Sequence, residues 1–345
     1  MADQPDRLVE TVTLGQAKSL MRALAAEQSL LLLSPPGAGK SESVAQVAAE
    51  AGLPCRSLLG TQIAPEDVSG IPRIIGERSV FCPPRILLPE SPEPFCLFLD
   101  ELPACAPDVQ KAFYSVLLER RLGEHALPAG TWVVAAGNRA QDRAVVRALS
   151  SALVNRVIIL NIRIDVREWL AWAAAHRVRS EILSFIMFMP EALMRPVPPQ
   201  PVPFSTPRAW ASLSRALDLT DAAGLESRET RRALAFGRLS PEDAAIFCAM
   251  AEESIENLLP PKHYIDAPES MPSGDAARWF LLQRVRTLVV RQELNEFSPE
   301  QINRFLQLLP ADHRFALLIG LVNQWGALGA DQAMFDSLRQ ATGLL

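Results

Sequence analysis

Ser34-Pro35-Pro36-Gly37-Ala38-Gly39-Lys40-Ser41 is the stretch that decides the fold of this chain of 345 residues. Four leucines, Leu30 to Leu33, come directly before it, and Val44, Val47 and Ala48 follow it at helical spacing. A buried strand, a glycine-containing loop and a helix, in this order, are the setting that a phosphate-binding loop requires. The pattern predicts an α/β fold with an anion site where the strand gives way to the helix.

The residues of this loop have separate chemical reasons to be there. Gly37 and Gly39 let the backbone turn its N–H groups toward an anion, where a side chain would block the approach. Lys40 supplies a positive charge for phosphate oxygens, and the Ser41 hydroxyl is placed to bind Mg²⁺. Ser34 stands where the usual pattern has glycine. We expect a small residue to suffice there, because the position mainly shapes the turn.

A second informative stretch is Pro94-Phe95-Cys96-Leu97-Phe98-Leu99-Asp100-Glu101. A continuous apolar run that ends in two carboxylates is typical of a buried parallel strand whose carboxyl end enters a site. We expect Asp100 to hold Mg²⁺ through water and Glu101 to polarise an attacking water. Many strands end in acidic residues because they reach solvent, so this pair gains its meaning from following the phosphate loop in the same chain.

Two further polar residues lie where a functional or a structural role fits equally. Asn138 follows the apolar strand Trp132 to Gly137, where an asparagine can position a water but is also a common turn residue. Arg208 follows Thr206 and Pro207, a predicted N-cap and first helical position. A cation in the first helical turn opposes the helix dipole, which is tolerable if the cation faces a bound anion. A surface arginine without such a role is the alternative. The sequence leaves both assignments open.

The remaining pattern predicts a parallel sheet followed by helices. Apolar strands alternate with helical patterns up to Asp165, and only helical patterns follow. The strands are expected at residues 30–33, 56–59, 94–99, 132–137 and 157–160. Residues 71–88 and 121–130 are predicted to form two inserted β-hairpins. The first is either a functional insertion or a plain surface hairpin.

The composition is that of an ordinary globular protein, with 49% hydrophobic and 21% charged residues. A net charge of −5 argues against a dedicated nucleic-acid-binding surface. The five cysteines form no CxxC pair and are expected to be reduced thiols of a cytoplasmic protein. The acidic N-terminus does not look like a signal peptide, and the densest apolar run, Ile182 to Met189, is too short to span a bilayer. We therefore expect no membrane partner.

The motifs SPPGAGKS, FLDE, Asn138, Arg156 and STPR occur in the order of an AAA+ ATPase, and the chain resembles the MoxR branch of that superfamily. The resemblance implies a parallel five-stranded sheet with flanking helices over residues 10–164. It further implies an all-helical lid that carries a second sensor over residues 165–225, and a helical C-terminal extension over residues 226–345. The two predicted hairpins resemble insertions of this branch.

The resemblance also implies roles for single residues. Glu101 corresponds to the catalytic glutamate, Asn138 to the first sensor and Arg156 to the arginine finger, which acts on the nucleotide of a neighbouring subunit. Arg147 is a second candidate for the finger, because it lies on the predicted helix that leads to Arg156. Arg208 corresponds to the second sensor. The implied ligands are ATP, bound by Pro36, Gly37, Ala38, Gly39, Lys40, Ser41, Ser43 and Arg208, and Mg²⁺, bound by Ser41 and Asp100.

Members of this branch usually form hexameric rings that remodel or activate a protein partner, often one with a von Willebrand factor A domain. The resemblance therefore implies a chaperone-like ATPase that hydrolyses Mg-ATP. A scaffold that binds ATP with negligible turnover is an alternative, and the intact Glu101 argues against it. A nucleic-acid-linked AAA+ motor is another, disfavoured by the acidic Glu66-Asp67 loop. A metabolic kinase would need neither the finger nor the lid.

Overall fold

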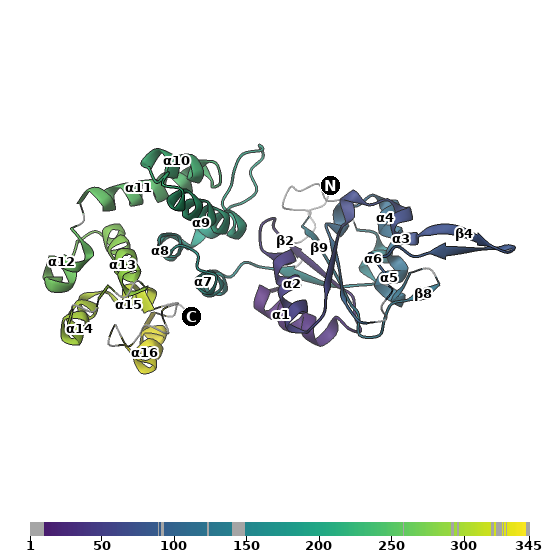
Figure 1. Ribbon diagram of the computed structural model, residues 1–345, viewed down its shortest axis with the longest axis horizontal. Helices are drawn as coiled ribbons and strands as arrows, with labels where there is room; N and C mark the ends of the chain where they lie inside the picture. The colour runs from purple at the N-terminus through teal and green to yellow at the C-terminus, as the bar shows by residue number, and fades with distance from the viewer. Residues whose placement is uncertain are drawn as a thin grey trace, which may run out of the picture. The chain divides into compact units, whose positions relative to one another are not determined.

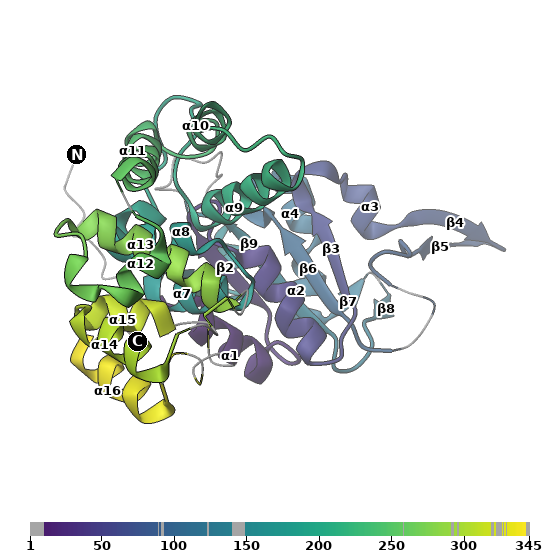
Figure 2. The ribbon, with the colours of Figure 1, turned by 60° about the vertical axis from the view of Figure 1, so that its left-hand side comes forward.

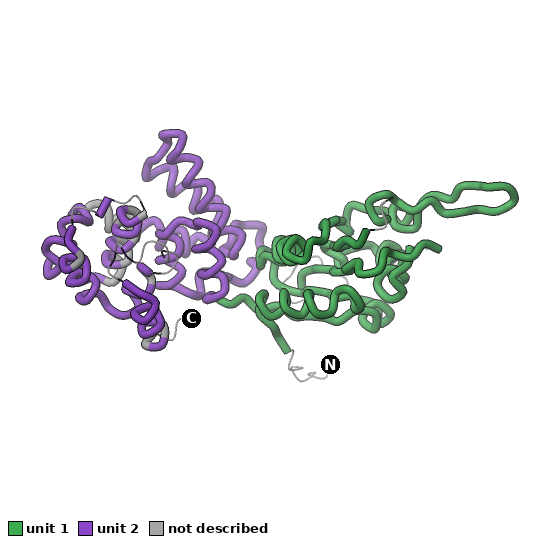
Figure 3. The backbone as a smooth tube through the Cα atoms, turned by 60° about the horizontal axis from the view of Figure 1, so that its bottom comes forward, with its two compact units in different colours: residues 1–165 green, residues 166–345 purple. Residues whose placement is uncertain are grey.

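The computed structural model of the chain describes residues 10–342, except for residues 89, 91–92, 123, 140–148, 258, 291–292, 295–296, 319–320, 322–325, 327 and 329. The chain divides into two units, residues 1–165 and residues 166–345 (Figure 3). The first unit carries the sheet, and the second is built from helices (Figure 1).

Six parallel strands form the main sheet of the first unit, in the order β1-β10-β2-β9-β6-β3. Of these, Figure 2 labels β2, β9, β6 and β3. Their bounds are β1 Thr11–Val12, β2 Leu30–Ser34, β3 Cys55–Leu59, β6 Cys96–Asp100, β9 Trp132–Asn138 and β10 Ile158–Ile162. The prediction of a parallel α/β sheet is confirmed, but the strand number of five was wrong. The additional strand, β1, has only two residues and pairs with β10. A segment this short has no apolar run from which a strand could be predicted.

Helices cover both faces of this sheet because its strands are apolar on both sides. Leu30 and Leu32 pack with α1 (Leu14–Leu24) and α2 (Lys40–Glu50). Leu31 points to the opposite face. The helices on that face are α4 (Pro107–Ala112), α5 (Tyr114–Glu119) and α6 (Ser151–Val154). A strand buried on both faces reads as a continuous apolar run, which explains the four consecutive leucines.

Both predicted hairpins are present. After the short helix α3 (Pro65–Ser69), β4 (Ile71–Ile75) and β5 (Arg78–Cys82) form an antiparallel pair that extends away from the main sheet (Figure 2). The second, much shorter hairpin consists of β7 (Arg121–Leu122) and β8 (His125–Ala126). The first hairpin leaves large apolar side chains in solvent, with Ile71 72% and Ile74 79% exposed.

The described residues of the second unit form helices and no strand, as the sequence predicts. The bounds are α7 Val166–Ala175, α8 Ser180–Phe188, α9 Pro207–Ala222, α10 Arg228–Phe236, α11 Pro241–Asn257, α12 Pro261–Asp266, α13 Asp275–Val290, α14 Pro299–Leu308, α15 Ala311–Leu318 and α16 Gln332–Thr342. The predicted N-cap of α9 is confirmed, because the Thr206 hydroxyl accepts a hydrogen bond from the Ala209 amide at 3.0 Å. None of the helices in the described part of the chain is long and apolar enough to cross a membrane.

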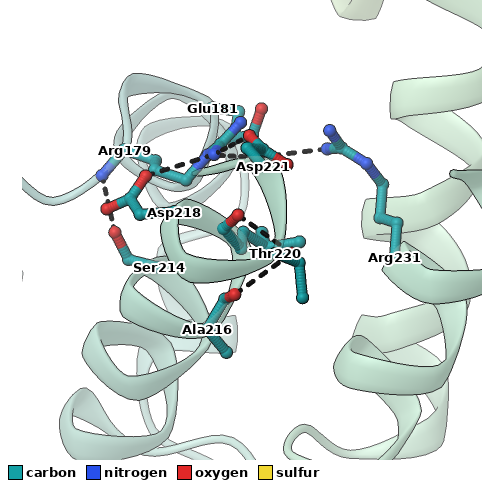
Figure 4. A network of polar contacts seen from close by, with 9 residues as sticks. Arg179, Glu181, Ser214, Ala216, Asp218, Thr220, Asp221 and Arg231 are labelled. Carbon is teal, nitrogen blue, oxygen red and sulfur yellow. Dashed lines mark hydrogen bonds and ion pairs between the residues drawn. The ribbon is translucent and has the colours of Figure 1, made fainter. Parts of the chain in front are cut away.

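An ionic network joins three helices of the second unit (Figure 4). Arg179, just before α8, donates to Glu181 on α8 at 2.8 Å and to Asp221 on α9 at 2.6 Å. Arg231 on α10 approaches the same Glu181 at 3.1 Å, and Glu181 is only 4% exposed. A buried carboxylate needs charged partners, and here two arginines supply them. The network therefore fixes α8, α9 and α10 relative to one another.

Candidate active site

The loop between β2 and α2 has the conformation that its glycines predict. The backbone φ angles are 78° at Gly37 and 94° at Gly39, in the left-handed region that glycine adopts without strain. Gly39 is the N-cap of α2, so the helix begins at Lys40 and Ser41. The first-turn N–H groups of a helix lack partners within the helix and form an anion site.

The Lys40 ammonium lies between the ends of β2 and β9. It donates to the Ser34 hydroxyl at 2.9 Å and to the side-chain oxygen of Asn138 at 3.3 Å. Ser34 and Asn138 are direct partners in the register of the two strands, which places both beside the amine. Lys40 is 7% exposed, so these contacts hold a buried charge. We expected position 34 mainly to shape the turn; the hydrogen bond from Lys40 to the Ser34 hydroxyl is an additional role.

The phosphate loop is joined to the end of β6 through Ser41 and Asp100. The Ser41 hydroxyl donates to Asp100 Oδ2 at 2.7 Å. Among the described residues, no group of three or more His, Cys, Asp and Glu side chains could hold a metal ion alone. Mg²⁺ at phosphate sites is held by one or two carboxylates together with waters and phosphate oxygens. One hydroxyl and one carboxylate side by side match that chemistry.

Glu101 follows directly and has an unusual backbone conformation, with a φ of 56°. Its amide donates to Asp100 Oδ1 at 3.0 Å, and its Oε2 accepts a hydrogen bond from the Thr61 hydroxyl at 3.2 Å. Thr61 comes just after β3, and Leu59 on that strand is the register partner of Asp100. Thr61 is not predictable as a site residue, because a threonine after a strand carries no signal of its own in the sequence. Strand pairing alone brings it to the carboxylate.

The site thus combines a glycine loop, an amine, a hydroxyl and two carboxylates at one edge of a parallel sheet. Residues 29–160, which include all of these groups, match the family model of the AAA domain, dynein-related subfamily. This part of the chain is an AAA domain.

Among the solved structures that are similar over most of the chain are those of two proteins, RuvB and NtrX. RuvB from Thermotoga maritima, titled a Holliday junction branch migration motor, has a TM-score of 0.40 and 15% sequence identity over 96% of this chain and 87% of that chain. NtrX from Brucella abortus has a TM-score of 0.42 and 13% identity over 98% of this chain and 69% of that chain. No curated protein matches the sequence.

Two glycines of the AAA domain allow close packing around the residues that follow Glu101. A Cβ atom added to Gly137 would lie 2.3 Å from Pro103 Cδ, so only glycine lets the residues after Glu101 pack against β9. A Cβ atom at Gly60 would lie 2.2 Å from Cys105 Sγ. Burial raises the pKa of the Cys105 thiol to about 11, so this cysteine stays protonated at neutral pH, and its Sγ donates to the Glu101 carbonyl at 3.5 Å. The two glycines thus permit the close contacts that Pro103 and Cys105, just after Glu101, make with Gly137 and Gly60.

Arg156 lies between α6 and β10 of the AAA domain and is half-buried. Its guanidinium stacks over the Tyr114 ring, 4.8 Å from the centroid, and its Nη1 donates to the Ala152 carbonyl at 2.7 Å. Tyr114 itself is held by a 2.6 Å hydrogen bond between its hydroxyl and that of Ser150. No described residue accepts a hydrogen bond from the buried Nε of Arg156. The guanidinium is thus held in one orientation while part of its hydrogen-bonding capacity stays unused.

The other predicted site residues in the described part of the chain lie in α2, in the loop before it and in α9, and their roles stay predictions. Ser43 is buried in α2, and its amide donates to the Gly39 carbonyl at 3.0 Å. Pro36 and Ala38 lie in the loop, where Ala38 is buried. Arg208 is exposed in the first turn of α9, in the second unit, so its approach to the loop stays a prediction. The alternative finger, Arg147, lies outside the described residues.

Proposed function

We propose that the protein is a ring-forming ATPase that hydrolyses Mg-ATP to remodel or activate a protein partner, as its resemblance to the MoxR branch implies. The observation that carries this proposal is the convergence of Lys40 and Ser41 with Asp100, Glu101 and Asn138 at one edge of the sheet. A phosphate-binding loop by itself can only bind a nucleotide. A second carboxylate beside it, such as Glu101, that does not hold the metal can act as a base for hydrolysis.

The residues divide the chemistry among them. The first-turn amides of α2 and the Lys40 ammonium bind and orient the β and γ phosphates. Ser41 and Asp100 would hold Mg²⁺, which neutralises charge on the phosphate oxygens when bound. Glu101 accepts a proton from the attacking water, and Asn138 orients that water at the end of β9. Lys40 keeps its contact with Asn138 only until phosphate oxygens compete for the same amine.

Two arginines complete the proposed site from outside the phosphate loop. Arg156 acts on the nucleotide of a neighbouring subunit in the ring, for which the motif order and the orienting stack on Tyr114 are the support. Arg208 acts as the second sensor from residues 165–225, the proposed lid, and its place beside the N-cap Thr206 is the support. A planar, permanently charged guanidinium suits both tasks.

The proposed partner is a folded protein, in the simplest case one with a von Willebrand factor A domain. The β4–β5 hairpin supports a protein partner, because Ile71 and Ile74 are more than two-thirds exposed. Ile74 lies on the same face of the hairpin as Phe81, which is 44% exposed, because Phe81 pairs with Pro72. Exposed apolar side chains gathered on one face mark interaction surfaces. The net charge of −5 is unsuited to a nucleic-acid track.

One comparison tests the proposal as a whole. The purified chain should release phosphate from ATP only with Mg²⁺ present, and it should run as a larger assembly with ATP than without nucleotide. A Glu101→Gln variant loaded with ATP should capture a protein partner, with a Lys40→Ala variant as the nucleotide-free control. Binding of ATP without measurable phosphate release would support the scaffold alternative, and stimulation of turnover by DNA would support the motor alternative.

A further inference from the structure

Cys55 and Cys96 are the first residues of two neighbouring strands, β3 and β6. The strands are parallel, and these two residues are direct partners in the register, so their side chains lie on the same face of the sheet. Neighbouring strands lie about 4.7–4.9 Å apart, and a disulfide joins Cα atoms about 4.4–6.8 Å apart. The expected Cα separation of the pair therefore lies within the range that a disulfide joins.

The two thiols differ in a way that suits sequential oxidation. Cys55 is exposed at the edge strand, whereas Cys96 is fully buried and packs in the core with Val47 and Phe98. The neighbouring Cys96 thiol lowers the pKa of Cys55 to about 7. The neighbouring Cys55 thiol and burial raise the pKa of Cys96. Cys55 is thus both the thiol that a reagent can reach and the one with the larger thiolate fraction at neutral pH.

We propose that Cys55 and Cys96 are a redox site that forms a reversible intramolecular disulfide when the protein meets a hydroperoxide. Cys55 is the thiol that attacks the oxidant, and Cys96 is the thiol that resolves the product. The proposal rests on the register of β3 and β6 and on the contrast in exposure, so it does not depend on the ATPase function.

The chemistry proceeds in two balanced steps. The Cys55 thiolate attacks one oxygen of the hydroperoxide; the S–O bond forms, the O–O bond breaks, and the departing alkoxide takes a proton to become an alcohol. The Cys96 sulfur then attacks the sulfenic acid on Cys55; the S–S bond forms, the S–O bond breaks, and the departing hydroxide takes the proton of Cys96 to become water. Two thiols are oxidised to one disulfide, and one hydroperoxide is reduced. A dithiol reductant reverses the change by thiol–disulfide exchange.

The position of the pair suggests what the bond does to the fold. Among the described strands, β3 is the last in the order of the main sheet and pairs with β6 alone. The carboxyl ends of these same two strands lead to Thr61 and Glu101, which are hydrogen-bonded to each other. A disulfide at the amino ends would fix the edge strand covalently. We expect slower hydrogen exchange of the β3 amides in the oxidised protein than in the reduced protein.

The test begins with the unmodified full chain treated with one equivalent of tert-butyl hydroperoxide under anaerobic conditions. Two of the five thiols should disappear, and proteolysis with mass spectrometry should identify a peptide in which Cys55 is linked to Cys96. Dithiothreitol should restore all thiols. A Cys96→Ala variant should instead retain a sulfenic acid on Cys55, trapped by dimedone. A Cys82→Ser variant is the matched control, because it removes the other exposed cysteine and should form the disulfide at the parent rate.

Several results would overturn the proposal. One is equal oxidation of Cys55 and Cys82, since it would show that exposure alone decides the reaction. Another is linkage between two chains in place of the internal link. A third is a dimedone adduct on Cys55 that is as abundant in the parent as in Cys96→Ala. The thiol count and the linked peptide are measured on the parent protein, so they decide the question even if a substituted chain folds poorly.

Discussion

The Thr61 hydroxyl donates a hydrogen bond to Glu101 Oε2 at 3.2 Å, between the carboxyl ends of β3 and β6. Glu101 itself has a left-handed backbone conformation, with a φ of 56°. This conformation costs a non-glycine residue about 1–3 kcal/mol and tends to occur at functional sites. A donor on this carboxylate competes with an attacking water for the same oxygen. We therefore expect this contact to restrain the proposed base until the hydrogen bond breaks.

Replacing Thr61 by valine should raise the basal ATP turnover. Valine keeps the branched shape and removes the only group that donates to Glu101 in this contact. A hydrogen bond of this kind contributes about 0.5–1.5 kcal/mol, which corresponds to an increase of about twofold to tenfold. Steady-state phosphate release at saturating Mg-ATP is the measurement. Thr61→Ser retains the hydroxyl and should behave like the parent; a lower turnover in Thr61→Val would mean that the contact orients Glu101 for catalysis.

Glu101→Gln should bind Mg-ATP as the parent does and hydrolyse it at least about a hundredfold more slowly. The amide preserves shape but cannot accept the proton of water, and general-base catalysis contributes about 10²–10⁴-fold. Binding is measured with a fluorescent ATP analogue, and turnover by phosphate release. Lys40→Ala is the contrasting variant, because it should lose nucleotide binding itself. Equal turnover in Glu101→Gln and the parent would remove Glu101 from the catalytic role.

The sequence predicted the sheet well because of how a strand buried on both faces is encoded. The leucines Leu30 to Leu33 and the run before Asp100 show no alternation of apolar and polar residues. Each forms a strand that pairs with a neighbouring strand on both sides. β1 has two residues, Thr11 and Val12, and exists through its pairing with β10. A segment that short has no periodicity, so its pairing cannot be derived from local pattern.

The site could be predicted only as far as its residues follow local rules. Gly39, Lys40 and Ser41 lie where a strand gives way to a helix, as the local sequence predicts, and their binding roles stay predictions. Thr61 reaches Glu101 because Leu59 pairs with Asp100, a relation set by tertiary structure. The same limit applies to Tyr114, which lies far from Arg156 in the sequence and yet stacks beneath it.

Arg195→Met should destabilise the helical unit strongly. The Arg195 guanidinium contacts both carboxylate oxygens of Asp243, at 2.6 Å for its closest contact, and Asp243 is fully buried near the start of α11. Removing the arginine leaves a buried carboxylate without its cation, which costs about 3–5 kcal/mol. The free energy of unfolding, from urea denaturation followed by circular dichroism, is the measurement.

The surface pair of Arg304 and Glu269 is the matched control for that experiment. Its side chains are 67% and 65% exposed and their closest atoms are 3.4 Å apart. Arg304→Met removes the same kind of charge from solvent, and exposed pairs contribute about 0–1 kcal/mol. Similar losses in Arg195→Met and Arg304→Met would show that burial of Asp243 does not decide the cost.

Arg156→Ala should bind ATP normally and hydrolyse it poorly, if Arg156 acts across a subunit boundary. Arginine fingers contribute about 10³–10⁵-fold where they have been measured, since a guanidinium stabilises charge that develops on the transferring phosphoryl group. The alternative is that Arg156 only stacks on Tyr114 and donates to Ala152. Its loss would then cost about 0.5–2 kcal/mol of stability and leave the turnover of folded protein unchanged.

Mixing two inactive variants separates these possibilities. Arg156→Ala keeps an intact phosphate loop, and Lys40→Ala keeps an intact finger, so a mixed assembly contains boundaries at which both are present. Activity should return in the mixture in proportion to such boundaries, although neither variant is active alone. Tyr114→Leu removes the ring beneath the guanidinium and should reduce turnover less than Arg156→Ala, since the charge remains. Mixed assemblies that form without recovering activity would exclude Arg156 as the finger, and Arg147 would become the residue to substitute next.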